Sequence, residues 1–270
     1  MANFATLLLI ALKAKRLSHL GGVFASLLLA SAPTLLIAAD VLPIGSVPSA
    51  ANIPLFSTKA AGAPPREWAF QALRGVKQTT RYAYVNDDTL NTTVLEGVAD
   101  AAAGALVYRF DGDAQLSSIL RFKWRAGNLI ASSDPKTKGG DDYVARVYVT
   151  FASDPQRASL REKTENALAN AVYGEVPPHA ALSYVFTHKA KLGEIVVSPY
   201  TARVKKIVVD ADPESVGKWR SFTRDIYDDY KRAFGEEPTR ISGIAIMVDT
   251  DNTGEKASAR FGDITLTARP

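Results

Sequence analysis

Two groups of acidic side chains in this sequence could do chemistry. Asp141 and Asp142 follow a pair of glycines, and Asp249 and Asp251 lie in a short polar run with Asn252. Four carboxylates held together without partners would repel one another, so their proximity would require a cation, an arginine or a ligand. We therefore predict that the two groups converge on a site for a hard cation, such as calcium, or for a polar ligand.

The candidate metal ligands are three of these acids and one acid of the last apolar run: Asp141, Asp249, Asp251 and Asp263. If no metal binds, Arg146 is the expected counter-charge and the cluster becomes an ion-pair network. The run from Asp249 to Gly254 is not an EF-hand, because Thr253 and Arg260 stand where that loop needs acidic ligands. The plainer alternative is a turn in which Asp and Asn side chains cap their own backbone.

The segment Asp142–Phe151 alternates like a strand with one apolar face. Its other face carries Asp142, Arg146 and Tyr148, an acid, a guanidinium and a phenol that can hydrogen-bond sugar hydroxyls or a carboxylate. We predict that these three residues bind a ligand. The alternative is a solvated sheet face with an Asp–Arg pair.

Two tryptophans have different expected roles. Trp124 shares its side of a strand with Leu120 and Phe122, so we expect it in the core. The opposite side of that strand carries the basic residues Arg121, Lys123 and Arg125. Trp219 lies on the same side as Ser221 and Thr223, and we predict it as a fourth ligand-binding residue, the alternative being that it covers a sheet edge.

Several kinds of chemistry are excluded by residue usage. The chain has no cysteine, so disulfides, zinc–thiolate sites and thiol nucleophiles are absent. Of its three histidines, His19 lies in the leader, so a multi-histidine metal site is not available to the mature chain. Glycoside cleavage by paired carboxylates needs a separation in space that a sequence does not give. Nucleophile-elbow, phosphate-loop and dinucleotide-binding motifs are absent.

The N-terminal residues 1–39 are typical of a secretory signal. An apolar run is followed by Lys13, Lys15 and Arg16, then by the apolar run Leu20–Ala39, and we predict cleavage near Ala39. The alternative is an uncleaved membrane anchor, because that run has about the 20 residues needed to span a bilayer. Residues 40–65 read as a Pro/Ala-rich linker, in which Ile53–Phe56 could form a first edge strand.

The charge balance argues against nucleic acid as a partner. The formal net charge is +4, but the three leader cations account for three of these charges and leave +1. A nearly neutral mature chain without a long Lys/Arg run has no electrostatic footprint for nucleic acid. We therefore expect an exported protein, periplasmic or extracellular, that contacts a membrane only through its leader if the leader is retained.

Short β-prone runs separated by turn residues fill most of the remaining chain. We predict a single mostly-β domain over residues 66–270, a two-sheet antiparallel jelly-roll-like sandwich with one longer helix (Pro155–Tyr173) and one short helix (Ile226–Phe234). The stretch Ile241–Leu266 is expected to be a hairpin with a polar tip. The other predicted strands are Thr79–Val85, Thr93–Ala99, Ala105–Phe110, Ser118–Arg125, Asp142–Phe151, Ala181–Thr187, Glu194–Ser198, Ala202–Val209 and Gly217–Thr223.

Five stretches together resemble one bacterial family, the domain of unknown function 3047: LRFKWR, KGGDDYVARVYVTF, LSYVF, GKW…RDIYDDYKRAFGEEP and IAIMVDTDNTG…ARFGDITL. The resemblance extends from about Trp68 to Leu266 and implies the extent of the domain, without an activity. The order of the segments also resembles jelly-roll, galactose-binding-like modules, which is an analogy of fold alone.

We therefore expect an exported, non-catalytic binding module for carbohydrate or another cell-envelope component. The alternative is a polysaccharide-acting enzyme, a hydrolase or lyase, that uses paired carboxylates with or without calcium. Acids converging in an open cleft would favour the enzyme. A shallow face with an exposed Trp or Tyr would favour binding.

Overall fold

The computed structural model describes residues 52–269, except residue 74 and, within the segment 155–177, residues 155, 157, 161, 162, 165, 166 and 168–177. The predicted leader, residues 40–51 of the linker and most of the predicted helix Pro155–Tyr173 lie outside the described residues. No helix in the described part of the chain is long and apolar enough to cross a membrane.

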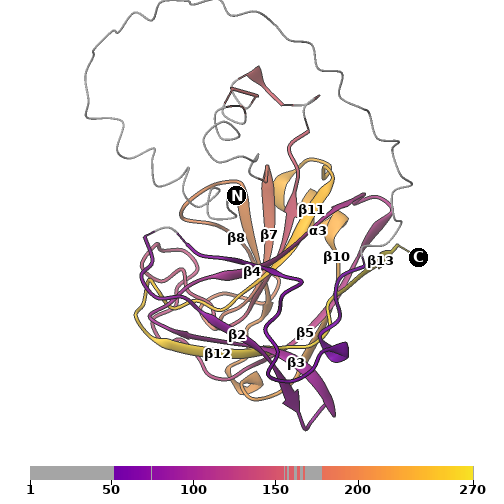
Figure 1. The fold of residues 1–270 in the computed structure, drawn as a ribbon. Helices are drawn as coiled ribbons and strands as arrows, with labels where there is room; N and C mark the ends of the chain where they lie inside the picture. The colour runs from indigo at the N-terminus through magenta and orange to yellow at the C-terminus, as the bar shows by residue number, and fades with distance from the viewer. Residues whose placement is uncertain are drawn as a thin grey trace, which may run out of the picture.

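The strands form two sheets that lie as separate layers (Figure 1). The seven-stranded sheet has, in order, β1 (Ala69–Gln71), β4 (Ala105–Gly112), β11 (Ile241–Met247), β6 (Arg146–Phe151), β7 (Ala180–Phe186), β9 (Val204–Asp210) and β8 (Ile195–Val197). The six-stranded sheet has β10 (Arg220–Asp225), β5 (Ser117–Ala126), β12 (Lys256–Phe261), β3 (Thr92–Asp100) and β2 (Arg81–Asp87), and β13 (Thr265–Ala268) also pairs with β5. Neighbouring strands are antiparallel except β7 and β9, which are parallel.

The main core fills the space between the two sheets. Leu120, Phe122 and Trp124 of β5 point inward and are buried, as their alternation predicts. The ring of Phe122 lies 5.6 Å from that of Tyr184, which belongs to the opposite sheet. Burial of each such large side chain contributes roughly 1.5–3 kcal/mol, and these contacts confirm the predicted two-sheet sandwich.

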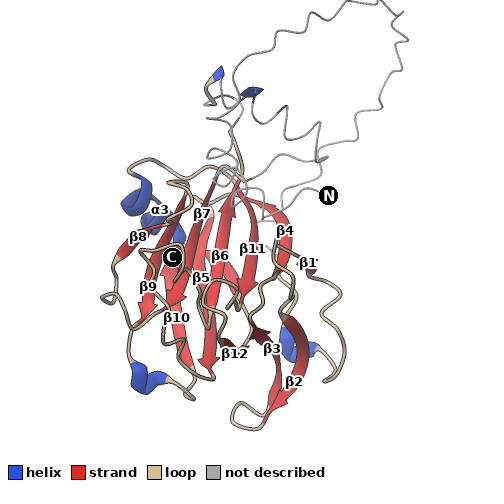
Figure 2. Ribbon diagram, turned by 90° about the vertical axis from the view of Figure 1, so that its left-hand side faces the viewer, coloured by secondary structure: helices blue, strands red, loops and turns tan. Residues whose placement is uncertain are grey.

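The helix α3 (Ile226–Phe234) and two 3-10 helices are short and lie at the margins of the sheets (Figure 2). The helix α3 has the predicted bounds: Asp225 accepts hydrogen bonds from the first free N–H groups, and Gly235 ends the helix in the left-handed conformation with a φ of 75°. Two 3-10 helices are also described, η2 (Phe56–Thr58) and η3 (Pro213–Ser215). The predicted edge strand Ile53–Phe56 is therefore wrong, because this segment enters η2.

The predicted hairpin Ile241–Leu266 is also wrong. Its first half is β11, which pairs with β4 on one side and β6 on the other, so no free edge remains for β12. The strand β12 instead pairs with β3 and β5 in the other sheet. The polar run Asp249–Gly254 is thus a crossover between the sheets.

Both faces of β6 are buried, which contradicts a solvated face for Arg146 and Tyr148. The reason is a second apolar cluster on the far side of the seven-stranded sheet, where Tyr148 packs with Val107 and Met247. The first residues of the predicted strand, Asp142–Ala145, are buried and precede β6 without joining it.

Candidate functional site

The two acidic groups meet at one end of the seven-stranded sheet because of the way β6 and β11 pair. These strands are antiparallel neighbours, and Arg146 at the start of β6 lies opposite Met247 at the end of β11. The segment that leads into β6 and the segment that leaves β11 therefore lie side by side. We call Asp141, Asp142, Asp249 and Asp251 the acidic cluster.

Asp249 is paired with Arg146. Its Oδ1 accepts hydrogen bonds from Arg146 Nε at 2.9 Å and from the backbone N–H of Tyr143 at 3.3 Å, and its Oδ2 contacts Arg146 Nη2. Asp249 and Arg146 are 1% and 5% exposed. A bidentate pair so far from solvent requires both partners, because either one left alone would be an unpaired buried charge.

Asp141 has a second buried cation, Lys206, which is 1% exposed. Lys206 Nζ lies 2.6 Å from Asp141 Oδ1 and also donates to the carbonyl of Pro135. The hydroxyl of Tyr143 donates to the same Asp141 oxygen at 3.1 Å. Burial lowers the pKa of Lys206, and the charge of Asp141 opposes this shift.

Asp142 is held by N–H groups of the crossover segment. Asp142 Oδ1 accepts from the Asn252 side chain at 2.9 Å, and Oδ2 accepts from the backbone of Asn252 at 3.1 Å and of Thr253 at 2.7 Å. The side chain is fully buried. Asp142 therefore fixes the conformation of the crossover that follows Asp249.

Asp251 is the least satisfied member of the acidic cluster. Its Oδ1 is buried and has no hydrogen-bond partner, although the residue is partly exposed. Burial, followed by the charge of Asp142, raises the pKa of Asp251. Nearby, burial and the charges of Asp141 and Asp251 raise the pKa of Tyr200 to about 12, so its hydroxyl remains a donor to Asn252 Oδ1 at 2.9 Å.

The acidic cluster meets one requirement of a cation site and fails another. Asp142, Asp249 and Asp251 each place a carboxylate oxygen within 4.8 Å of the others, which is close enough to share an ion. However, both oxygens of Asp249 contact Arg146, and both oxygens of Asp142 accept N–H bonds. Calcium takes 6–8 oxygen ligands, so the donor set fits an ion-pair network better than a calcium ion, and metal binding here stays a prediction.

Two further predicted site residues lie away from the acidic cluster. Asp263 accepts hydrogen bonds from the backbone and the hydroxyl of Ser57, at 2.9 and 2.6 Å, and so holds η2. Trp219 lies just before β10 and contacts Asp87 of the six-stranded sheet. The predicted ligand-binding set is thus divided, with Asp142, Arg146 and Tyr148 buried at the other sheet.

The outward side of the six-stranded sheet carries a different set of charges. Because inward and outward side chains alternate, Arg121, Lys123 and Arg125 of β5 point away from the core, and Arg260 of β12 lies directly beside Arg125. We call these four residues and Trp219 the cationic face. None of the five is buried, in contrast to the acidic cluster.

One buried carboxylate anchors one end of the cationic face. Asp87 Oδ2 lies 2.8 Å from Arg125 Nη2 and 3.0 Å from Arg260 Nη1, and Asp87 Oδ1 accepts from Trp219 Nε1 at 3.1 Å. Burial alone would raise the pKa of Asp87, but hydrogen bonds from Arg260 and Trp219 outweigh burial and lower it. The guanidinium of Arg125 lies 5.5 Å from the Trp219 ring centre, so the indole is held in place.

The other end of the cationic face retains free positive charge. Arg121 donates to the hydroxyl of Thr267 at 2.8 Å, and within the described residues neither Arg121 nor Lys123 forms an ion pair. Thr223 and Ser221 of β10 lie opposite these two cations in the strand register. The alternation of LRFKWR predicts that these basic residues share one side of the strand. Nothing in the sequence predicts that Asp87 contacts Arg125, Arg260 and Trp219.

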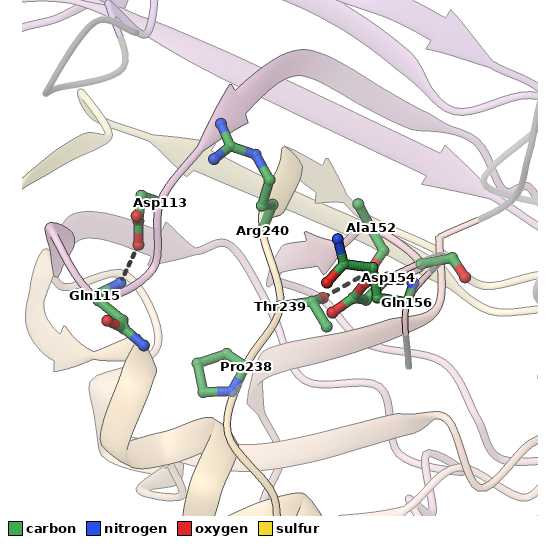
Figure 3. A pocket seen from close by; sticks show the side chains of 9 residues that line it. Asp113, Gln115, Ala152, Asp154, Gln156, Pro238, Thr239 and Arg240 are labelled. Carbon is green, nitrogen blue, oxygen red and sulfur yellow. Dashed lines mark hydrogen bonds between the residues drawn. The ribbon is translucent and has the colours of Figure 1, made fainter. Parts of the chain in front are cut away.

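A cavity of about 400 Å³ lies at another edge of the molecule. Figure 3 shows Asp113 and Gln115 on one side of this space and Asp154 and Gln156 on the other, with the segment 238–240 between them. The backbone N–H groups of Gln115 and Gln156 donate to the two carboxylates, at 2.7 and 2.8 Å. Each acid therefore also caps its own turn.

Comparisons with known proteins give a family and distant structural neighbours. The model of the family described as "Protein of unknown function (DUF3047)" matches residues 66–265. An exo-beta-agarase structure is 11% identical, with a TM-score of 0.33, and the match covers 80% of this chain but only 25% of that chain. The cellulose induced protein Cip1 is 8% identical, with a TM-score of 0.32, over 77% of this chain and 94% of that one. No curated protein matches the sequence.

Proposed function

The chain belongs to the DUF3047 family, and we propose that it is an exported, non-catalytic binding module for carbohydrate or another component of the cell envelope. The observation that supports this function is the cationic face, where Trp219 is held by Asp87 and Arg125 on the open side of a sheet. A tryptophan ring beside polar groups can stack on a sugar ring while the polar groups bind hydroxyls. Ser221 and Thr223 supply hydroxyls on the same side.

The state of the acidic cluster weighs against catalysis there. A general acid or base must come within hydrogen-bonding reach of its substrate. Asp142 and Asp249 are 0% and 1% exposed, and their oxygens already accept bonds from Asn252, Thr253 and Arg146. These carboxylates hold the crossover segment in place and leave no surface for a glycosidic bond.

The alternative, a polysaccharide-acting enzyme, would use the cavity in Figure 3. Asp113 and Asp154 line the same open space there, and a catalytic carboxylate pair must flank one substrate. Loss of glycan turnover in an Asp154→Asn variant, with the fold retained, would support this alternative. We expect no turnover in the parent chain.

The test is binding without turnover. The full chain is applied to a glycan array, and the positive glycans are then incubated with it and assayed for new reducing ends and for unsaturated products. We expect binding and no products. A Trp219→Ala variant should lose about tenfold or more in affinity, since truncating an aromatic anchor of a binding site costs on the order of 2 kcal/mol. Trp219→Tyr should retain most of the affinity.

Export is tested separately. Residues 1–39 have a secretory pattern, so N-terminal sequencing of protein from the native compartment should give a start near Asp40. Recovery of the intact chain from Met1 in membranes would instead favour an anchor.

A further inference from the structure

We propose that the cationic face binds an anionic polysaccharide, whose carboxylate or sulfate groups contact Arg121 and Lys123. This inference rests on the proposed function and names its ligand class. It depends on the difference between the two ends of the face, because one end is neutralised by the protein's own acids and the other is not.

The acids on this side of the sheet are already engaged. Asp87 is shared by Arg125 and Arg260, and Arg260 Nε also lies 2.9 Å from Glu96. At the ends of the sheet, Asp100 pairs with Lys256 and Asp225 with Arg269. Among the cations on this side of β5 and its neighbours β10 and β12, those without an acidic partner in the described residues are Arg121 and Lys123.

The two cations lie close enough together to contact one ligand. Arg121 and Lys123 are two residues apart on one side of β5, which places their Cα atoms roughly 7 Å apart. The stem of Lys123 lies over Gly262, where an added Cβ would come within 2.6 Å of Lys123 Cγ, so the glycine makes room for the side chain. Ser221 and Thr223 on β10 lie opposite Lys123 and Arg121 in the register.

The chemistry of the face favours an acidic glycan over other anionic partners. Guanidinium and ammonium groups bind carboxylates and sulfates, and neighbouring hydroxyls bind sugar hydroxyls. A single-stranded nucleic acid would be held by several aromatic rings along a cationic groove, and a duplex by many phosphate-binding cations. This face offers one aromatic ring, Trp219, and two cations without an acidic partner. A membrane would need apolar side chains, and the exposed large hydrophobic residues of the described chain all lie outside β3, β5, β10 and β12.

The experiment compares polygalacturonate with neutral dextran, using the full chain and isothermal titration calorimetry. Polygalacturonate should bind, and more weakly as salt rises because exposed charges are screened. The double variant Arg121→Gln/Lys123→Gln should bind about tenfold more weakly or worse. The matched control Lys189→Gln/Lys191→Gln removes the same charge from exposed positions outside the face and should stay within about twofold. Melting curves verify that both variants are folded.

The outcomes separate the two proposals. Equal binding of dextran and polygalacturonate, or an unchanged affinity in the double variant, overturns the anionic ligand and leaves the carbohydrate-binding function in place. If single-stranded DNA or phosphatidylglycerol vesicles bind more strongly than polygalacturonate, the proposal that a glycan occupies the cationic face is overturned. The absence of binding to any glycan in the array overturns both proposals.

Discussion

The acidic cluster and the cationic face are both built from charged side chains, but they differ in access to water. In the first, Arg146 and Lys206 are 5% and 1% exposed and are bound to carboxylates. In the second, Arg121 is exposed and Lys123 is partly exposed, and neither has an acidic partner among the described residues. Charge buried with its counter-charge holds the fold, whereas exposed charge without a partner is available to a ligand.

The largest expected effect is at the acidic cluster. Arg146→Met leaves Asp249 as an unpaired buried carboxylate, so we expect the free energy of unfolding to fall by about 3–5 kcal/mol in urea titrations. Arg121→Met, the exposed control, should change it by less than about 0.5 kcal/mol.

A second variant tests the reason for this loss. In the double variant Arg146→Met/Asp249→Asn the uncompensated charge is gone, so part of the stability should return. If the free energy of unfolding fell as much in Arg121→Met as in Arg146→Met, the proposed difference between the two regions would be contradicted.

Asp87→Asn should have an intermediate effect, because it removes a charged acceptor shared by Arg125, Arg260 and Trp219. We expect the free energy of unfolding to fall by about 1.5–3 kcal/mol at pH 7. The pKa of Asp87 is lowered in the folded state, so its contribution is present above the ordinary carboxyl range and is lost as pH falls through the lowered value. The difference in the free energy of unfolding between Asp87→Asn and the parent chain should therefore become smaller at acidic pH. Glu96→Gln, at a half-exposed pair, should cost no more than about 1 kcal/mol.

Asp251→Asn should have a smaller effect of opposite sign. The pKa of Asp251 is raised by burial and by Asp142 from an ordinary value of 3.8. The folded chain therefore binds a proton more tightly at this site than the unfolded chain, and stability falls as pH rises from 3.8 through the raised value. We expect the variant to melt higher than the parent chain at pH 7 and equally at about pH 3.5. Asp88→Asn, at an exposed position, should show no such gain.

Calcium should have the smallest effect of all. Because Arg146 and backbone N–H groups occupy the oxygens of Asp249 and Asp142, millimolar calcium should shift the melting temperature by less than about 1 °C. An ion that binds only the folded state at a hundred times its Kd would stabilise the fold by about 2.7 kcal/mol. A saturable rise that disappears in Asp251→Asn would show that the cluster is a metal site.

Features set by nearby residues could be predicted from the sequence. Alternation places Trp124 in the core, and Asp225 and Gly235 set the ends of α3. The approach of Asp141–Asp142 to Asp249 could be stated only as a hypothesis, because it depends on β6 and β11 being neighbours. That pairing is a non-local choice, and strand patterns do not specify it.

Features set by distant residues could not be predicted. The turn chemistry of Asp249–Gly254 is the same for a hairpin and for a crossover between sheets, since Asn, Asp and Gly serve both. The pair Arg260–Asp87 is 173 residues apart in the chain, and Lys206–Asp141 is 65 apart. Burial of the Arg146 face likewise follows from a second apolar layer that no single strand pattern reveals.

The most direct test of the central claim is to locate the bound glycan by hydrogen–deuterium exchange of the full chain with and without oligogalacturonate. Ligand binding should slow exchange in β5 around Arg121–Arg125 and in the segment that carries Trp219. It should leave Asp141–Asp142 and Asp249–Gly254 unchanged, because their protection comes from the fold itself. Protection confined to the acidic cluster or to the cavity of Figure 3 would contradict the assignment of binding to the exposed cations.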